Sequence, residues 1–260
     1  MQKALKYIVI ATFILILAVG ITASYKAGRE AAQGIVCRRI EVVVKDSARN
    51  SFIRQEDIKN YISKEYGRYK GLPLDSLDLG RIEKIVDSKS AVLKSEVYVT
   101  ADSTLHVDIT QRRPVVRFQK GGEGFYADKD GFLFPLQKRF SSYVPIVDGA
   151  IPLKADSGYR GEGADAKEKK WIADILNLLD YIRSNGTWRD NITQIHIESN
   201  GDIVLIPRAG KERFNIGKAD NLREKFAKIE KYYTAIAPSK EEGYYSKVNV
   251  KYEGQIICKQ

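Results

Sequence analysis

Residues 92–116 read VLKSEVYVTADSTLHVDITQRRPVV. Apolar residues recur at every second position in both halves of this stretch, first as Val97 and Val99 and then as Leu105, Val107 and Ile109. A period of two is typical of strands with one buried face. The segment between the two runs, Ala101-Asp102-Ser103, has the composition of a turn. The stretch therefore predicts an antiparallel hairpin with strands at residues 92–100 and 104–110.

The residues before this hairpin predict a strand and two helices. Residues 38–44 pass into a run of β-branched residues, which favours a strand. Apolar residues return at helical intervals in two later segments, as Ile53, Ile58, Tyr61, Ile62 and Tyr66 and then as Leu79, Ile82, Ile85 and Val86. Each pattern gives a helix one apolar face, over residues 53–66 and 76–88. The order strand, helix, helix, strand, strand predicts one small domain at residues 37–113.

Residues 7–25 form an uncharged and mostly aliphatic run of nineteen residues. At about 1.5 Å per residue, a helix of this length covers roughly 28 Å, close to the ~30 Å hydrocarbon core of a bilayer. We therefore predict a transmembrane helix at residues 7–25, a cytoplasmic tail at residues 1–6 and a linker at residues 26–36. The domains that follow would lie on the other side of the membrane.

A cleaved secretory signal is the alternative interpretation of this segment. Lys3 and Lys6 supply the basic residues with which such signals begin. The apolar run is longer than the usual length of about 7–15 residues, and it offers few small residues for cleavage apart from Ala18 and Gly20. A membrane anchor is therefore the favoured interpretation. Basic residues after the run outnumber those before it, so the cytoplasmic placement of the N-terminus depends on the shortness of the tail.

The composition predicts folded domains. The 260 residues are 43% hydrophobic and 29% charged, which provides enough apolar material for a core. The formal net charge is +10, and it is +8 without Lys3 and Lys6. Basic residues are scattered among acidic residues and form no stripe, so we interpret the excess positive charge as a solvated surface, with attraction to anionic lipid or wall polymer as the alternative. A nucleic-acid partner is not expected outside the cytoplasm.

Few residues are suited to catalysis. His106 and His196 each lie within an alternating run, in the opposite phase to its apolar residues, and should face solvent or a shallow groove. Neither has a nucleophile or a metal-binding residue at a recognisable spacing. We interpret Cys37 and Cys258 as small apolar residues on strands, with a disulfide as the less favoured alternative. We therefore predict no enzymatic activity, no cofactor and no metal.

Residues 114–260 predict a second and larger domain. Helical and alternating patterns are both present, and an Asn-Gly pair at residues 200–201 predicts a hairpin. Helices are expected at residues 167–184 and 222–234, and strands at residues 193–198, 202–206, 212–216, 244–252 and 255–258.

The order of elements in the small domain resembles that of a POTRA domain. A motif narrows the resemblance to one family. The chain reads Arg112-Arg113-Pro114-Val115-Val116, which is similar to a motif of the bacterial cell-division family FtsQ/DivIB. In that motif an acidic residue, an arginine, a variable residue and Pro-Val follow the hairpin, and Gln111 stands here in the acidic place. Residues 125–135, 144–149 and 251–254 are also similar to the family, so the resemblance covers most of the chain.

The resemblance implies an α+β fold. It would comprise an N-terminal transmembrane helix, a small POTRA domain (β-α-α-β-β) and a larger α+β domain with a mostly antiparallel sheet packed by helices. The chain would be a non-enzymatic scaffold of the divisome in the inner (cytoplasmic) membrane, at the division septum, with both domains in the periplasm or its extracytoplasmic equivalent. Its partners would be FtsB/DivIC-like and FtsL-like single-span proteins, and it would help to control septal peptidoglycan synthesis.

The resemblance also implies where the partner binds. An edge strand exposes backbone groups with which a partner strand can pair. The residues implied are Tyr245, Val248, Val250, Lys251, Tyr252, Gln255, Ile256 and Ile257, with Arg112, Pro114 and Val115 as the family motif. The POTRA domain would offer a second edge of this kind. The alternative is that the tail is an ordinary closing strand with no partner.

Two other functions are kept as alternatives. A POTRA-bearing component of a translocation or assembly machine would handle unfolded polypeptides, and co-purification with such polypeptides would favour it over a scaffold. A periplasmic hydrolase would require a nucleophile with its base, and the sequence shows no such pattern.

Overall fold

The computed structural model describes residues 10, 12–25, 35–45, 52–137, 140–155 and 158–260. The chain divides into two compact units, residues 1–111 and 112–260, which are considered separately. Residues 12–25 are helical with exposed side chains, whereas most of the residues at the start of the predicted span and most of the predicted linker lie outside the described part. Within the described ranges no helix combines the length and the apolar character needed to cross a bilayer. The transmembrane helix thus stays a prediction.

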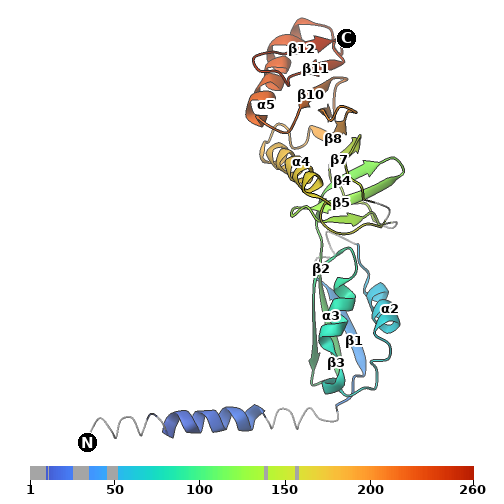
Figure 1. The fold of residues 1–260 in the computed structure, drawn as a ribbon, viewed down its shortest axis with the longest axis vertical. Coiled ribbons are helices and arrows are strands. Elements are labelled where there is room, and N and C mark those ends of the chain that lie inside the picture. Colours follow the sequence, from blue (N-terminus) through green and yellow to red (C-terminus); the bar gives the residue numbers. More distant parts are fainter. Residues whose placement is uncertain (1–9, 11, 26–34, 46–51, 138–139, 156–157) are drawn as a thin grey trace, which may run out of the picture. The chain divides into compact units, whose positions relative to one another are not determined.

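The first unit contains a three-stranded sheet and two main helices (Figure 1). Its central strand β3 runs antiparallel to β2 and parallel to β1. This unit has the predicted order of strand, helix, helix, strand, strand. The elements are β1 (Arg39–Val44), α2 (Gln55–Glu65), a short 3₁₀ helix (Leu74–Ser76), α3 (Leu79–Asp87), β2 (Val92–Thr100) and β3 (Thr104–Gln111).

The core of this unit follows the predicted periodicity. Ile62 of α2, Ile82 of α3 and Val107 of β3 are all completely buried. Gln111, at the end of β3, is buried too, and its side-chain oxygen accepts a hydrogen bond of 2.8 Å from the backbone N–H of Ile53. The amide at this position therefore positions the chain just before α2, and does so without a buried charge.

Helix α3 occupies the outer flank of β2. The backbone N–H and the hydroxyl of Ser95 both donate to Asp87 Oδ1, at 2.8 and 2.7 Å. The N–H of Val97 donates to Glu83 Oε1 at 3.0 Å. These two N–H groups point away from β3 and are among those that an added strand would need. Helix α3 therefore blocks this part of the expected second edge, and the other end of the sheet within the described ranges is the outer flank of β1.

Loss of this closure should destabilise the first unit. We expect Asp87→Ala to lower the free energy of unfolding by about 1–3 kcal/mol, because the Ser95 N–H loses a charged acceptor. Glu65→Ala, at an exposed position of α2, is the control and should change stability by no more than about 0.5 kcal/mol. Urea denaturation measures both variants. Equal stability of Asp87→Ala and the parent would show that the carboxylate does not hold β2.

The second unit is built on a nine-stranded sheet with the order β12-β11-β10-β9-β8-β7-β4-β5-β6. Five neighbouring pairs are antiparallel, and β10–β11, β4–β7 and β7–β8 are parallel. Its strands are β4 (Pro114–Lys120), β5 (Glu123–Asp128), β6 (Leu133–Pro135), β7 (Ile146–Gly149), β8 (Ile192–Ile197), β9 (Ile203–Pro207), β10 (Arg213–Gly217), β11 (Lys247–Asn249) and β12 (Ile257–Lys259).

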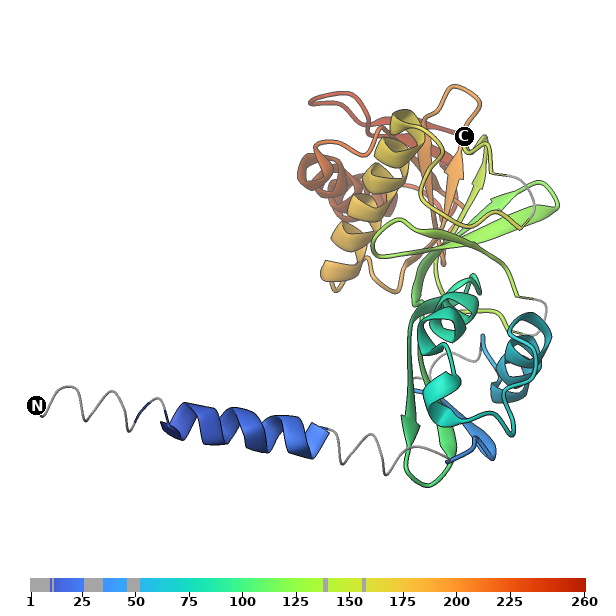
Figure 2. The same cartoon turned by 60° about the horizontal axis from the view of Figure 1, so that its bottom comes forward.

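Two helices cover one face of this sheet, α4 (Ala166–Ser184) and α5 (Leu222–Lys231) (Figures 1 and 2). Ile175 and Ile229 are fully buried in the core that they share with the strands. Asp165 caps the start of α4 by accepting hydrogen bonds from the N–H groups of Lys167 and Glu168, both at 2.9 Å. These bonds, with the Lys154 ammonium, lower the pKa of the Asp165 carboxyl to about 2.

In the second unit, three predicted elements differ from the structure by more than one residue at an end. The predicted helix 222–234 leaves α-helical geometry at Tyr232 and continues as a π-helical turn, Tyr232–Ile236. The predicted strand 244–252 shortens to β11, because the Asn249 side chain accepts the N–H of Lys251 at 3.0 Å and turns the chain there. The strand predicted at residues 255–258 begins later, as β12.

Candidate partner-binding edge

The two ends of the large sheet differ. At β6, the backbone of Leu133 exchanges two hydrogen bonds with Gly161, of 2.7 and 3.0 Å, so that flank is occupied. At the other end β12 pairs with β11 on one flank. No strand within the described ranges pairs with its second flank. The exposed edge of this unit is therefore β12.

The direction of the hydrogen bonds identifies the exposed backbone groups of β12. Ser246 accepts the N–H of Arg213 and Val250 donates to Asn215, so alternate residues of β11 face β10. Lys247 and Asn249 lie between them and face β12, where their partners are Lys259 and Ile257. By the same alternation, Cys258 directs its N–H and C=O to the outer flank.

The prediction that Val248 and Val250 lie on the edge strand is wrong. Strand β11 pairs on both flanks, with β10 and with β12, and is an interior strand. Both valine side chains are buried, at 1% and 0% exposure, in the core beneath the helices. Tyr245 is partly buried against the same core. Period-two alternation identifies the buried face of a strand, but it cannot show which flanks are paired, and this caused the error.

Of the other predicted residues, Ile257 lies on β12, whereas Lys251, Tyr252, Gln255 and Ile256 lie in the segment that joins β11 to β12. Tyr252 and Ile257 are exposed at 49% and 37%, Gln255 is exposed, and Ile256 is packed against the core. The Lys251 ammonium pairs with Asp202 at 2.7 Å and thereby holds the last turn to the β8–β9 hairpin. Burial raises the pKa of Asp202, but the hydrogen bonds from Lys251 and Asn215 outweigh it, so that pKa lies below its usual value.

Cys258 is the residue of the edge that sequence reasoning left out of the site. Its side chain is partly buried beside Val248, its register partner, and burial raises the pKa of the thiol. Both cysteines are free. Cys258 lies on a strand as expected, whereas Cys37 lies two residues before β1. The register of β12 against β11 would have revealed the outward backbone of Cys258, but sequence alone does not fix that register.

Aromatic side chains support the start of β11. Tyr232 is buried, with its ring 5.5 Å from that of Phe214 and 6.5 Å from that of Tyr245. Its hydroxyl donates to Glu212 Oε1 at 3.5 Å. Burial and the nearby Glu212 carboxylate together raise the pKa of Tyr232 to about 12, and burial followed by Glu212 does the same for Tyr233.

These tyrosines predict alkaline instability of the β10–β11 region. Because the folded protein holds the phenol protons more tightly than the unfolded chain, stability is complete below about pH 10 and falls as the pH rises toward about 12. Tyr232→Phe removes one of the two groups and should lose less stability over this range. Denaturant unfolding at several pH values measures it. An equal alkaline loss in parent and variant would contradict the assignment.

Arg112, the arginine of the family motif, forms an ion pair that joins two parts of the second unit. Arg112 Nη1 pairs with Asp128 Oδ2 at 2.7 Å, and its guanidinium lies 3.5 Å from the centre of the Phe132 ring. Asp128 Oδ1 accepts the N–H groups of Asp130 and Phe132, both at 3.0 Å. Arg112 thus ties the β5–β6 turn to the start of β4. Pro114 is buried as the first residue of β4, and the next residue, Val115, packs against the core.

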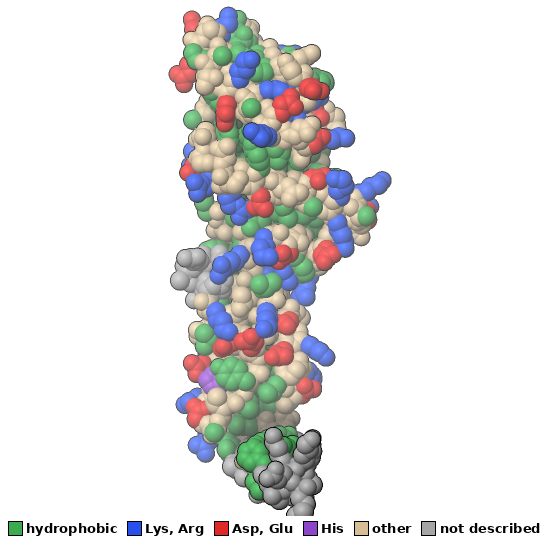
Figure 3. Space-filling model, turned by 90° about the vertical axis from the view of Figure 1, so that its left-hand side faces the viewer, with side chains coloured by type: hydrophobic (Ala, Val, Ile, Leu, Met, Phe, Trp, Pro, Cys, Tyr) green, Lys and Arg blue, Asp and Glu red, His purple; other side chains and the backbone are tan. Residues whose placement is uncertain are grey.

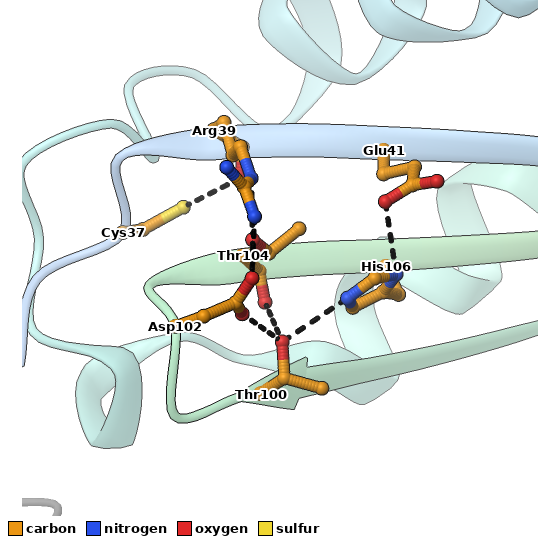
Figure 4. Close-up of polar contacts among 7 residues, drawn as sticks. All are labelled: Cys37, Arg39, Glu41, Thr100, Asp102, Thr104 and His106. Atoms are coloured by element: carbon orange, nitrogen blue, oxygen red, sulfur yellow. Dashed lines mark hydrogen bonds and ion pairs between the residues drawn. The ribbon is translucent and has the colours of Figure 1, made fainter.

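A cluster of polar side chains lies at the β2–β3 turn of the first unit (Figure 4). His106 Nε2 is 3.1 Å from Thr100 Oγ1, and His106 Nδ1 is 3.7 Å from Glu41 Oε2. The Thr100 hydroxyl also donates to Asp102, which pairs with Arg39. The hydrogen bond from Thr100 is the largest cause of the lowered pKa of Asp102.

This cluster has the residue types of a catalytic relay, and its hydrogen bonds tie the β2–β3 turn together. The Thr100 hydroxyl is shared among the Asp102 carboxylate, the Thr104 carbonyl and the His106 ring, so it is not reserved for the imidazole as the nucleophile of a relay would be. The His106 ring stacks on Tyr98 with 4.9 Å between ring centres. His106 is less exposed than expected, and the cluster joins β1 to the hairpin.

The second histidine belongs to a hydrogen-bonded group that joins β8 to β7. His196 Nδ1 lies 2.7 Å from Asp148 Oδ1, and the same carboxylate accepts Gln194 at 2.7 Å. In the described part of the chain, no group of three or more His, Cys, Asp or Glu side chains is placed to hold a metal ion. On the face shown in Figure 3, basic and acidic side chains are interspersed, as the sequence indicated.

Comparison with known families agrees with this architecture. Residues 35–110 match the POTRA-like domain, and residues 113–259 match the family described as FtsQ/DivIB, C-terminal related. The protein is thus of the class that joins a POTRA-like domain to a larger sheet domain. Because the second match covers more than half of the chain, the chain belongs to the FtsQ/DivIB, C-terminal related family, and its role is associated with the divisome. No curated protein matches the chain.

Proposed function

We propose that this chain is a membrane-anchored, non-enzymatic scaffold of the divisome that binds FtsB/DivIC-like and FtsL-like single-span proteins and helps to control septal peptidoglycan synthesis. Family membership supports a role in division, and the open flank of β12 supports the mode of binding. A partner segment in extended form would add to β12 as a further strand, so that backbone hydrogen bonds supply most of the attachment.

A membrane anchor at residues 7–25 is part of this proposal. Side chains such as Phe13, Leu15 and Ile16 are 64–69% exposed on a helix without charged residues, as suits a helix surrounded by lipid. Anchoring confines the domains to the membrane surface that single-span partners also occupy. The effective concentration of the partner is then high, and a contact through a strand of three residues is sufficient.

The observation that carries the proposal is the outward backbone of Cys258. Its N–H and C=O are the central pair of groups on the open flank, and its side chain faces inward and does not obstruct them. Lys247 and Lys259 are exposed and directly opposite each other across β11 and β12. Like charges in that position repel, and an acidic side chain on the incoming strand would relieve the repulsion.

Proline at residue 258 tests strand addition without breaking the fold. Proline is accepted on edge strands where the N–H points outward, but it removes the donor that a partner strand needs. We expect Cys258→Pro to unfold at the same denaturant concentration as the parent and to bind the FtsB/DivIC-like protein at least about tenfold more weakly, from the lost hydrogen bond and the steric block. Biolayer interferometry with the full-length chain in detergent measures the affinity.

Two matched variants complete this test. Cys258→Ala keeps the N–H and should bind like the parent. Val250→Pro removes an internal bond to Asn215 and should instead destabilise the sheet, by about 3 kcal/mol. Parent-like binding by a folded Cys258→Pro protein would exclude β12 as the docking edge. Capture of unfolded polypeptides in place of single-span division proteins would favour the assembly-machine alternative.

A further inference from the structure

The ladders on either side of β7 do not reach the starts of the neighbouring strands β4 and β8. Strand β7 begins to pair with β4 only at Arg117, three residues after β4 begins, and with β8 only at Gln194, two residues after β8 begins. Between the starts of β4 and β8 no strand lies within the described ranges. A groove of about 620 Å³ occupies this place, and all of its lining residues belong to the second unit.

The floor of this groove is apolar. Leu179 and Ile182 reach it from the last part of α4, and Ile192 from the start of β8, each at most 3% exposed. Ile146, the first residue of β7, also lines it and is 37% exposed, which is unusual for an isoleucine of a central strand. Tyr143 stands at the rim with 88% of its surface exposed. The groove therefore offers a ligand the exposed side chains of Ile146 and Tyr143 beside a buried apolar layer.

The rim is strongly basic. Arg117, Arg183, Arg189 and Arg208 all line the groove, and Asp190 is the one acidic residue among its lining residues. The Arg117 guanidinium donates to the Gln119 amide, and the Arg208 guanidinium donates to the Asp190 carbonyl and the Tyr143 hydroxyl. Neither guanidinium forms an ion pair with a carboxylate in the described part of the chain, whereas Arg183 pairs with Asp180 at 2.6 Å. This local excess of positive charge favours an acidic ligand.

One wall of the groove is the start of β4. The N–H of Arg117 donates to the Pro145 carbonyl at 3.0 Å, so Arg117 faces the β7 flank. The ladder between β4 and β7 begins at Arg117, so from Pro114 to Val116 no strand lies beside β4 on that flank within the described ranges. An extended peptide would fit beside this part of β4.

We propose that this Arg-lined groove binds an extended acidic peptide segment of a partner protein, with an apolar side chain seated on the floor and carboxylates on Arg117 and Arg208. Strands β9, β10 and β11 separate β8 from β12 in the sheet, so this site is distinct from the edge at β12. It does not depend on strand addition at β12.

A synthetic peptide tests the proposal directly. The probe is fluorescein-labelled Glu-Leu-Glu-Leu-Glu-amide, titrated with the full-length protein in detergent and followed by fluorescence anisotropy. We expect saturable binding that weakens as salt is added. The peptide with glutamine in place of glutamate, and the peptide with serine in place of leucine, should each bind at least about tenfold more weakly, because one loses the charges and the other the apolar contact.

Charge reversal on the protein locates the site. Arg117→Glu and Arg208→Glu should each weaken binding of the acidic peptide by about tenfold, because attraction becomes repulsion. Arg223→Glu, on the exposed face of α5, changes the net charge equally and should leave binding unchanged. Circular dichroism checks that all three variants fold. Parent-like binding in both groove variants, or an equal loss in Arg223→Glu, would overturn the proposal.

Vesicles separate a peptide from a lipid surface. If vesicles of phosphatidylcholine with phosphatidylglycerol bind the protein through Arg117 and Arg208 while the acidic peptide does not bind, the groove is a headgroup site and the peptide proposal is wrong. The outcome at β12 is read separately, because Cys258→Pro should leave peptide binding in the groove unchanged. Loss of peptide binding in Cys258→Pro would contradict two separate sites.

Discussion

The backbone groups at the ends of a β-sheet must find partners, and this requirement organises the whole protein. Water can satisfy them, but an open flank then invites another strand. The first unit closes one flank with side chains, because Asp87 and Glu83 of α3 accept the outward N–H groups of β2. The second unit closes the flank of β6 with the backbone of Gly161. Within the described ranges, neither side chains nor backbone groups close the outer flank of β12 in this way, so β12 is the open edge of the second unit.

Sequence patterns predicted most of the fold because the two periodicities are clear in it. The alternation around Val107 identified the central strand of the first unit, and the stripe containing Ile175 identified α4. The order of elements in the first unit followed from these local signals alone. Both patterns report which side of an element meets the core, and burial of Val107 and Ile175 agrees with them.

The candidate site was predicted less well, because pairing between distant segments leaves no periodic trace. The alternation around Val250 is compatible with an edge strand. The N–H of Val250 nevertheless donates to the carbonyl of Asn215, 35 positions earlier in the chain. The sequence indicated that Cys258 is a small apolar residue on a strand, whereas the register of β12 directs its backbone N–H and C=O to the outer flank. Arg112 was noted as a family motif, and its ion pair with Asp128 could be assigned only from the structure. The groove beside β7 depends on where a strand starts, which sequence patterns place only to within a few residues.

An open edge must accept a partner and still reject copies of itself, and β12 has features suited to both tasks. It is only three residues long, so the ladder that any strand can form with it is short. Lys247 and Lys259 carry like charges across β11 and β12. A second copy of β12 would bring further lysine to this point and increase the repulsion, whereas a strand with a carboxylate there would reduce it. The same logic applies at the groove, where Arg117 and Arg208 lack acidic partners within the described ranges. Both positions combine an incomplete ladder with basic side chains, and this shared chemistry is the ground on which both proposals stand.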